Sequence, residues 1–384
     1  MAAVRGKAAS RGGAKPPLYL DLNYGILYIR SEKVEYLSMP KPSDKILVIR
    51  LSSLGDLILM MPMLSTLREG LPEARIELLV KERYAELFEE SPYIDRLIAV
   101  RRGDIRELIE LRSELARERY DTLIDAHNVI RSNVLFHSLH APRKLQIRKN
   151  EAKKLLLIAG KINLYRRVTT QIQRYLQMTR SMGLDSSGKP DRLHIPPKAA
   201  ARVDALLERP ARGGGEIAAF APGAHWETKR WPEEHFAELI SLVSARGLRP
   251  VLIGGAEDAI LNAALARQAG PAVSDLTGKL SIMESASVLA RSAALVTNDS
   301  APLHLAEAVG TPVVALFGPT VREFGYFPRL EASRVLETSL GCRPCSRNGK
   351  RPCPYGTKEC LTAITPASAF EALSGVLAGR AVCP

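Results

Sequence analysis

The stretch ALVTNDSAPLHLAEAVGTPVVALFGPT, residues Ala294–Thr320, predicts a strand, a sharp turn, a helix and a second strand. Ala294–Thr297 is a short apolar run, and Asn298–Ser300 then supplies short side-chain oxygens that can accept from the free N–H groups of a first helical turn. Pro312–Phe317 is a second apolar run. Two buried strands joined by one helix predict a parallel sheet. The helix start then lies at the carboxyl end of the sheet, where its partial positive charge favours a phosphate.

The same alternation of short apolar runs and amphipathic segments recurs on both sides of a polar segment, 184–197, that is rich in Pro, Gly and Ser. We therefore predict an α/β protein with two Rossmann-like domains. The expected division is a basic amino-terminal extension (1–40, partly disordered), a first domain (41–190), a linker (191–205) and a second domain (206–384) with a cysteine-rich loop (341–361).

Composition narrows the class of protein. The chain has 384 residues, enough for two cores, and its apolar runs are all shorter than a membrane span. Its start does not have the pattern of a signal peptide, and five cysteines are too few for a secreted disulfide framework. A cytoplasmic enzyme is expected.

Positive charge is concentrated in one segment. Residues 131–180 contain twelve Lys or Arg and one acid, a balance of 12 − 1 = +11 out of +13 for the whole chain. Such a run indicates either a solvated helix face or a surface for an anionic partner. A nucleic-acid partner is disfavoured, because the segment has few aromatic residues and matches no common binding motif.

Four blocks together resemble the lipopolysaccharide heptosyltransferase family, glycosyltransferase family nine. They are IRLSSLGDLILMMPML at Ile49–Leu64, FAPGAHWETKRWPEEHF at Phe220–Phe236, LIGGAED at Leu252–Asp258 and VTNDSAPLHLAEAVGTPVVALFGPT at Val296–Thr320. The resemblance implies a GT-B fold with two facing Rossmann-like domains, parallel sheets and a carboxy-terminal helix that crosses back. It also implies an ADP-heptose donor, an inner-core acceptor on lipid A and inversion at the anomeric carbon. Two alternatives remain: a relative that uses another nucleotide sugar and acceptor, and a non-catalytic Rossmann protein that binds a nucleotide or nucleic acid.

Two residues are the candidate catalytic groups. Asp56 matches the Gly-Asp carboxylate of the family and is the candidate base for the acceptor hydroxyl; an ordinary helix cap is the alternative. Gly55 is expected to form a tight turn that points Asp56 into the cleft. Lys229 matches the lysine two positions before Trp-Pro and is expected to neutralise the departing diphosphate; a solvated loop lysine is the alternative.

Two further groups of residues follow from the same blocks. For Asp299 a sugar hydroxyl contact and a capping role are equally supported, and for His304 a packing role is the alternative. Ala224 and His225 stand where some family members carry threonines, which leaves backbone N–H groups as the phosphate contacts in that loop. The expected donor-binding residues are Gly223, Ala224, Arg230, Gly255, Glu257, Asp299, Ser300 and His304, and the expected acceptor-binding residues are Ser53, Gly55, His127, Arg131, Arg143 and Lys144.

Expectations for cofactors and partners complete the prediction. No Asp-x-Asp motif accompanies the donor blocks, so we expect no metal ligands and no required cofactor, with the ADP-sugar acting as substrate. Cys342, Cys345, Cys353 and Cys360 have the ligand number for structural zinc but not a standard spacing, and loop thiols, reduced or partly disulfide-linked, are favoured. The expected partners are the nucleotide sugar and an acidic, lipid-linked saccharide, with peripheral contact at the inner face of the cytoplasmic membrane.

Overall fold

The computed structural model describes residues 20–21, 26–27, 41, 44–186, 192–208 and 215–380. Residues 1–39 and 40–384 form separate compact units. In the first unit, strands β1 (Leu20–Asp21) and β2 (Ile26–Leu27) pair antiparallel. The rest of the predicted extension, including its predicted disorder, lies outside the described residues.

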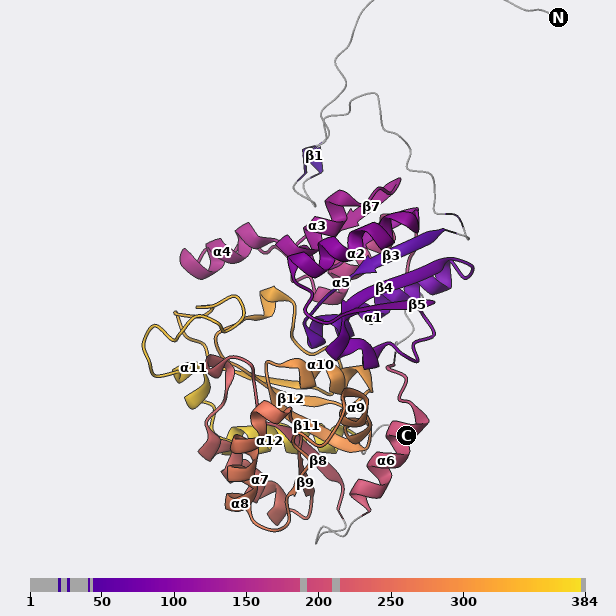
Figure 1. Ribbon diagram of the computed structural model, residues 1–384. Helices are drawn as coiled ribbons and strands as arrows, with labels where there is room; N and C mark the ends of the chain where they lie inside the picture. Colours follow the sequence, from indigo (N-terminus) through magenta and orange to yellow (C-terminus); the bar gives the residue numbers. More distant parts are fainter. Residues whose placement is uncertain are drawn as a thin grey trace, which may run out of the picture. The chain divides into compact units, whose positions relative to one another are not determined.

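The amino-terminal half of the larger unit contains a five-stranded parallel sheet in the order β5-β4-β3-β6-β7 (Figure 1). Its strands are β3 (Lys45–Ile49), β4 (Arg75–Lys81), β5 (Arg96–Val100), β6 (Thr122–Asp125) and β7 (Arg143–Gln146). Its helices are α1 (Leu54–Gly70), a 3₁₀ helix (Glu82–Leu87), α2 (Ile105–Arg117), α3 (Ile130–Ser138), α4 (Glu151–Ala159) and α5 (Gln171–Arg180).

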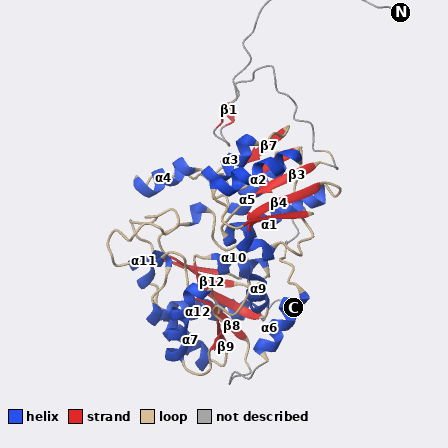
Figure 2. Ribbon diagram, in the orientation of Figure 1, coloured by secondary structure: helices blue, strands red, loops and turns tan. Residues whose placement is uncertain are grey.

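The carboxy-terminal half contains a six-stranded parallel sheet in the order β10-β9-β8-β11-β12-β13 (Figure 2). Its strands are β8 (Ile217–Ala221), β9 (Arg249–Leu252), β10 (Ser274–Asp275), β11 (Ser292–Asn298), β12 (Val313–Phe317) and β13 (Arg334–Glu337). Its helices are α6 (Pro197–Leu207), α7 (Glu233–Ala245), α8 (Ala259–Ala269), α9 (Ile282–Ala290), α10 (Ala301–Ala308), α11 (Glu359–Thr362) and α12 (Pro366–Arg380), with 3₁₀ turns at Glu227–Lys229, Ala256–Asp258 and Arg322–Phe324.

The stretch Ala294–Thr320 folds as predicted. All residues of β11 and β12 are buried, and the two strands pair in parallel on either side of α10 in the chain. Burial on both faces explains why these strands are continuous apolar runs, because helices cover both sides of such a sheet. The predicted fold class, two Rossmann-like halves with parallel sheets, is confirmed.

Both sheets have a topological switch point. In the carboxy-terminal half the chain moves outward from β8 to β9 and β10, and then outward on the other side from β11 to β12 and β13. In the amino-terminal half the corresponding pair is β3 and β6. Open α/β sheets bind ligands in the crevice beyond the carboxyl ends of such a strand pair. The loops after β3, β6, β8 and β11 are therefore the places to look for a site.

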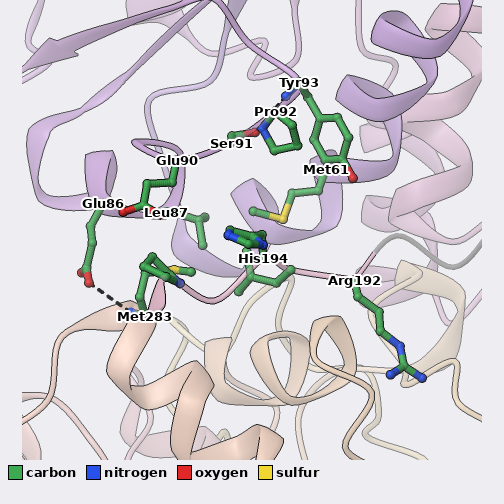
Figure 3. A pocket seen from close by; sticks show the side chains of 12 residues that line it. Met61, Glu86, Leu87, Glu90, Ser91, Pro92, Tyr93, Arg192, His194 and Met283 are labelled. Carbon is green, nitrogen blue, oxygen red and sulfur yellow. Dashed lines mark hydrogen bonds between the residues drawn. The ribbon is translucent and has the colours of Figure 1, made fainter. Parts of the chain in front are cut away.

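The two halves share one apolar core. A single cluster of buried residues runs from α1 and α5 to α9 and α10. Beside it, the Glu86 carboxylate accepts from the backbone N–H groups of Ile282 (3.0 Å) and Met283 (3.3 Å) at the start of α9. Figure 3 shows Glu86 and Met283 at a small pocket that is also lined by Met61, Tyr93 and His194 among others. This pocket lies where the chain passes from one half to the other, and it contains none of the predicted site residues.

Three features differ from the prediction. The last helix does not cross back over its described length: α12 packs on α7 and on β11 to β13, because Ala369, Leu373 and Val376 give it an apolar face for that core. The predicted linker overlaps α6, a helix that the sequence also predicts over 198–207, and α6 packs on α9 through an Arg202–Glu284 ion pair of 2.9 Å. The sequence of residues 83–90 predicts a helix, whereas the structure has a 3₁₀ helix that ends at Leu87.

Candidate active site

Asp56 lies in the first turn of α1, directly beyond the carboxyl end of β3. Its Oδ2 atom accepts from Ser53 Oγ (2.8 Å) and pairs with the Arg50 guanidinium (2.7 Å), while Oδ1 accepts from the hydroxyl of Tyr326 (3.1 Å). Arg50 and Ser53 come from the loop after β3, whereas Tyr326 follows β12 in the other half. Three donors from both halves therefore orient one carboxylate.

These contacts decide the charge of Asp56. Burial by itself raises the pKa of the carboxyl group, but the Arg50 charge and the hydrogen bonds from Ser53 and Tyr326 outweigh it, so the pKa lies below its ordinary value. Asp56 is consequently ionised at neutral pH. A carboxylate offers about four lone-pair positions, and three are taken, which leaves room for one further donor.

A cleft opens in front of Asp56. It is rich in cations, and its lining residues are Arg50, Ser52, Ser53, Asp56, His127, Lys149, Glu151, Lys154, Gln171 and Tyr326. Burial, followed by the Arg50 charge, lowers the pKa of His127 to about 3, so this imidazole is neutral. The three cations of the cleft outnumber its two carboxylates, Asp56 and Glu151, so the cleft favours an anionic ligand.

The loop after β6 is shaped by its own strand. The Asp125 carboxylate accepts from the backbone N–H groups of His127 (2.9 Å) and Asn128 (2.8 Å), which closes a tight turn. The turn holds His127 against the loop after β3, where its Nδ1 accepts from the Leu51 N–H at 3.4 Å. The two loops of this switch point are thereby fixed to each other.

The carboxy-terminal switch point holds a second ion pair. Lys229 Nζ lies 2.6 Å from Asp299 Oδ2 and also donates to the Asp299 carbonyl at 3.2 Å. Thr320 Oγ1 donates to the same Oδ2 at 2.7 Å. Asp299 is thus engaged with Lys229 and Thr320, while Ser300 occupies the N-cap position of α10 without a side-chain cap bond. Asp299 holds the ammonium group beside the start of α10.

The neighbouring loops approach one another closely. A side chain on Gly223 would overlap the Asp258 carboxylate, which itself accepts from the Gly255 N–H at 3.1 Å. The guanidinium of Arg230 is tied to the Ala224 carbonyl at 2.8 Å. These predicted donor residues therefore surround the carboxyl ends of β8 and β9, with Glu257 exposed beside them.

His304 lies between the two ion pairs. A Cβ atom on Gly55 would come within 2.8 Å of His304 Cδ2, so the close packing of α1 on α10 requires glycine there. Gly55 is inside helix α1 and forms no tight turn, contrary to the prediction, and its role is this close approach. Burial lowers the pKa of His304 to about 4, and its Nδ1 has no hydrogen-bond partner among the described residues.

Three of the predicted acceptor residues lie elsewhere. Arg143 lies at the amino ends of the strands, away from the cleft. It is paired in register with Thr122 at the start of β6, and its Nη1 lies 3.6 Å from Oδ2 of Asp44, just before β3. Lys144 donates to the carbonyl of Phe136 at 2.9 Å and to that of Leu139, so it caps α3. The structure contradicts the prediction for both. Arg131 donates to the Gly103 carbonyl at 2.9 Å and does not line the cleft.

Several cleft residues were not predicted individually. Lys149 and Lys154 belong to the basic stretch that the sequence revealed, but nothing in the pattern singled them out from its other cations. Arg50 directly follows a buried strand, which was an available signal. Tyr326 and Gln171 carried none, because they reach the cleft through contacts between distant parts of the chain.

The cysteine-rich loop holds free thiols at Cys342, Cys345, Cys353 and Cys360. Within the described residues, no group of three or more His, Cys, Asp or Glu side chains has an arrangement suited to a metal ion. The same part of the chain contains no helix long and apolar enough to cross a membrane.

Comparison with known proteins gives the family. Residues 108–356, more than half of the chain, match the sequence model of Glycosyltransferase family 9 (heptosyltransferase). The chain belongs to this family. Family 9 relatives include lipopolysaccharide heptosyltransferase 2 of Salmonella typhimurium, 28% identical over 359 residues that cover 88% of this chain and 100% of that protein. Lipopolysaccharide heptosyltransferase 1 of Pseudomonas aeruginosa is 27% identical over 340 residues, 82% of this chain and 89% of that protein.

Solved structures agree with the family assignment. A family 9 glycosyltransferase from Veillonella parvula superposes with a TM-score of 0.74 at 25% identity, covering 88% of this chain and 98% of that one. ADP-heptose lipopolysaccharide heptosyltransferase II of Escherichia coli superposes with a TM-score of 0.68 at 24% identity, covering 88% and 100%. The resemblance inferred from the four sequence blocks is confirmed, and so is the GT-B type of fold.

Proposed function

We propose that this family 9 member is an inverting glycosyltransferase that moves a heptose from ADP-heptose to the inner core of lipopolysaccharide. One observation carries the proposal: the buried His304 lies within electrostatic reach of the Asp56 carboxylate from one half and of the Lys229–Asp299 pair from the other. The Asp56–Tyr326 hydrogen bond and the packing of His304 on Gly55 hold the two switch points together. The relatives named above are heptosyltransferases, which supports the choice of sugar.

Asp56 acts as the general base in this proposal. The acceptor hydroxyl donates to the free lone pair of the carboxylate and attacks the anomeric carbon on the face opposite the diphosphate. The bond from that carbon to the diphosphate oxygen breaks, its electrons leave with ADP, and the hydroxyl proton passes to Asp56. Because Asp56 is already ionised, no other group must first remove a proton from it.

Lys229 and the start of α10 neutralise the departing diphosphate. The ammonium is only partly exposed and is fixed by Asp299, so little reorganisation is needed when charge develops. The N–H groups of the first turn of α10 add their dipole at the same end of the sheet. Gly223, Gly255 and Arg230 complete the donor side, where the Asp258 and Glu257 carboxylates pack against the two glycines.

The acceptor side fits an acidic saccharide. Lys149 and Lys154 present two cations to the cleft that contains Asp56, Arg50 stays paired with Asp56, and Ser53 and His127 add polar groups at its edge. Carboxylate or phosphate groups on an inner-core sugar would pair with these cations. The amino-terminal half is accordingly the acceptor half, and the carboxy-terminal half the donor half. We also propose that transfer needs no metal ion, since Lys229, Arg230 and α10 provide the positive charge.

A turnover assay with matched nucleotide sugars tests the proposal. Purified protein is given ADP-, UDP- and GDP-linked sugars with a heptose-deficient core acceptor, with and without a chelator. We expect transfer from ADP-heptose alone, unchanged by the chelator and abolished in Asp56→Ala, while Ile260→Ala at an exposed site of α8 behaves as wild type. Transfer from another nucleotide sugar would replace the donor assignment. Salt-sensitive binding of nucleic acid without any transfer would replace the enzymatic one.

A further inference from the structure

Exposed apolar side chains gather in one short segment of the amino-terminal half. Among the described residues, ten large hydrophobic side chains are exposed, and five of them lie within 155–168. They are Leu155 (59%), Leu156 (41%), Ile162 (51%), Leu164 (46%) and Val168 (40%). Apolar groups scattered singly on a surface need no explanation, whereas a contiguous exposed apolar patch is typical of an interaction site.

The same segment is strongly basic. Between residues 148 and 168 the chain has seven Lys or Arg and a single acid, Glu151. The exposed cations among them are Arg148, Lys153, Lys161, Arg166 and Arg167. Apolar side chains flanked by cations match the chemistry of an anionic lipid surface, where the apolar groups enter the acyl boundary and the cations meet headgroup phosphates.

Helix α4 connects this surface to the cleft. Figure 1 shows α4 projecting from the rest of the amino-terminal half. On one face of the helix Leu157 is buried and Lys154 lines the cleft, together with Lys149 just before the helix. The opposite face carries Leu155 and Leu156. One short element thus contributes to both the cleft and the exposed apolar cluster.

Contacts with the other half hold the segment in place. Lys161 Nζ donates to the carbonyls of Cys342 (2.7 Å) and Pro344 (2.8 Å) in the cysteine-rich loop, and Asn163 donates to Glu323 at 2.9 Å. Glu151 pairs with Arg347 of the same loop. The apolar cluster is therefore presented by an anchored segment.

We propose that residues 148–168, the docking segment, bind the protein to an anionic phospholipid surface and place the mouth of the cleft beside it. The benefit for the reaction rests on the proposed function: a lipid-linked acceptor would pass from the bilayer to Asp56 along the inner face of α4. The binding itself needs only the lipid. Leu155, Leu156 and Ile162 enter the interface, and Arg148, Lys153 and Arg167 meet the phosphates.

Vesicle flotation of the full chain tests the proposal without donor or acceptor. We expect wild type to float with phosphatidylcholine vesicles that contain phosphatidylglycerol, less at high salt, and weakly with phosphatidylcholine alone. Leu155→Gln/Leu156→Gln is expected to lower partitioning about tenfold or more, because two apolar anchors are lost. Ile105→Gln/Ile109→Gln, an exposed apolar pair on α2, is the matched control and is expected to float as wild type.

Three outcomes would overturn the docking segment. The first is that wild type does not float, and the second is that the Leu155→Gln/Leu156→Gln variant floats as well as wild type. The third is a wild-type dimer in analytical ultracentrifugation that dissociates in this variant, which would make the apolar segment a contact between copies of the chain. Sugar transfer separates this proposal from the enzymatic one. The variant should keep transfer to a deacylated, soluble acceptor and lose transfer to a vesicle-embedded one. Lipid binding without any transfer in wild type would refute the proposed function and leave the docking segment intact.

Discussion

The two switch points each hold a carboxylate paired with a cation, but the two pairs are built differently. Arg50 Nη2 and Asp56 Oδ2 are 2.7 Å apart, and Asp56 lines an open cleft. Lys229 and Asp299 are 2.6 Å apart, and Asp299 is also bonded to Thr320. In the first pair Arg50 orients the carboxylate and keeps it ionised, whereas in the second pair Asp299 fixes the position of the ammonium group. A carboxylate–cation pair can therefore present a base in the amino-terminal half and a positive charge in the carboxy-terminal half.

Exchanging each carboxylate for its amide gives the largest expected difference. Asp56→Asn removes the base, and we expect kcat to fall about 10³-fold, which corresponds to about 4 kcal/mol of barrier. Asp299→Asn leaves Lys229 in place but less well fixed, and we expect about a tenfold rise in the donor KM with a smaller change in kcat. Steady-state kinetics of both variants, with circular dichroism to verify folding, measures this. Equal losses of kcat would show that the two pairs do not differ in role.

Removing Lys229, the cation of the carboxy-terminal pair, is the next test of the comparison. Lys229→Met should lower kcat about 10²-fold, because one preorganised charge is lost where the diphosphate departs. Lys229→Arg should recover part of the rate, whereas Arg230→Met, whose guanidinium is tied to the Ala224 carbonyl, should cost less than Lys229→Met. The ratio of the two methionine variants decides the assignment. A greater loss in Arg230→Met would move the phosphate contact to that residue.

The two pairs also differ in how much of them the sequence could predict. Asp56 and Lys229 both lie in short blocks next to buried strands, where the strand fixes the backbone and the loop composition indicates a site. The partnership of Lys229 with Asp299 was not predicted, since 70 residues separate them and only the parallel pairing of β8 with β11 brings their loops together. The local sequence pattern predicts a strand, its loop and a candidate residue in that loop, but it does not predict which distant residues that loop contacts.

The acceptor side shows the same limit more strongly. A cluster of cations was visible in the sequence, yet Arg143 and Lys144 were chosen and Lys149 and Lys154 line the cleft. The difference is the unpredicted strand β7 (Arg143–Gln146): residues at its start lie at the amino end of the sheet, and residues beyond its end lie at the carboxyl edge. A shift of a few residues along β7 decides whether a lysine lies at the amino or the carboxyl end of the sheet. The pattern of charges in the sequence does not show where the strand begins and ends.

His304, which lies between the two pairs, should make the stability of the protein depend on pH. Its pKa is lowered by burial to about 4 from an ordinary 6.5, so below pH 6.5 the unfolded chain binds a proton that the folded chain does not. The free energy of unfolding should therefore fall as the pH drops from about 6.5 toward 4, by an amount on the order of 3 kcal/mol. Urea unfolding of wild type and His304→Gln across this range measures it. We expect a shallower slope in the variant, and His225→Gln at an exposed site serves as control. Parallel slopes for wild type and His304→Gln would refute the assignment.

The smallest expected effect concerns Tyr326, the hydroxyl that the carboxy-terminal half contributes to Asp56. Tyr326→Phe removes one of three donors to the carboxylate, and the ionised form of Asp56 loses stabilisation while its protonated form does not. The pKa of Asp56 should rise, and the acid limb of kcat/KM should move to higher pH by no more than about one unit. At neutral pH the carboxylate stays ionised, so the rate there should change little. Tyr355→Phe, at an exposed position, should leave the profile as in wild type. A large loss of kcat/KM at neutral pH with an unchanged acid limb would mean that Tyr326 contacts the substrate itself. Tyr326 would then be a third functional group, beside the carboxylate that accepts a proton and the carboxylate that holds a cation.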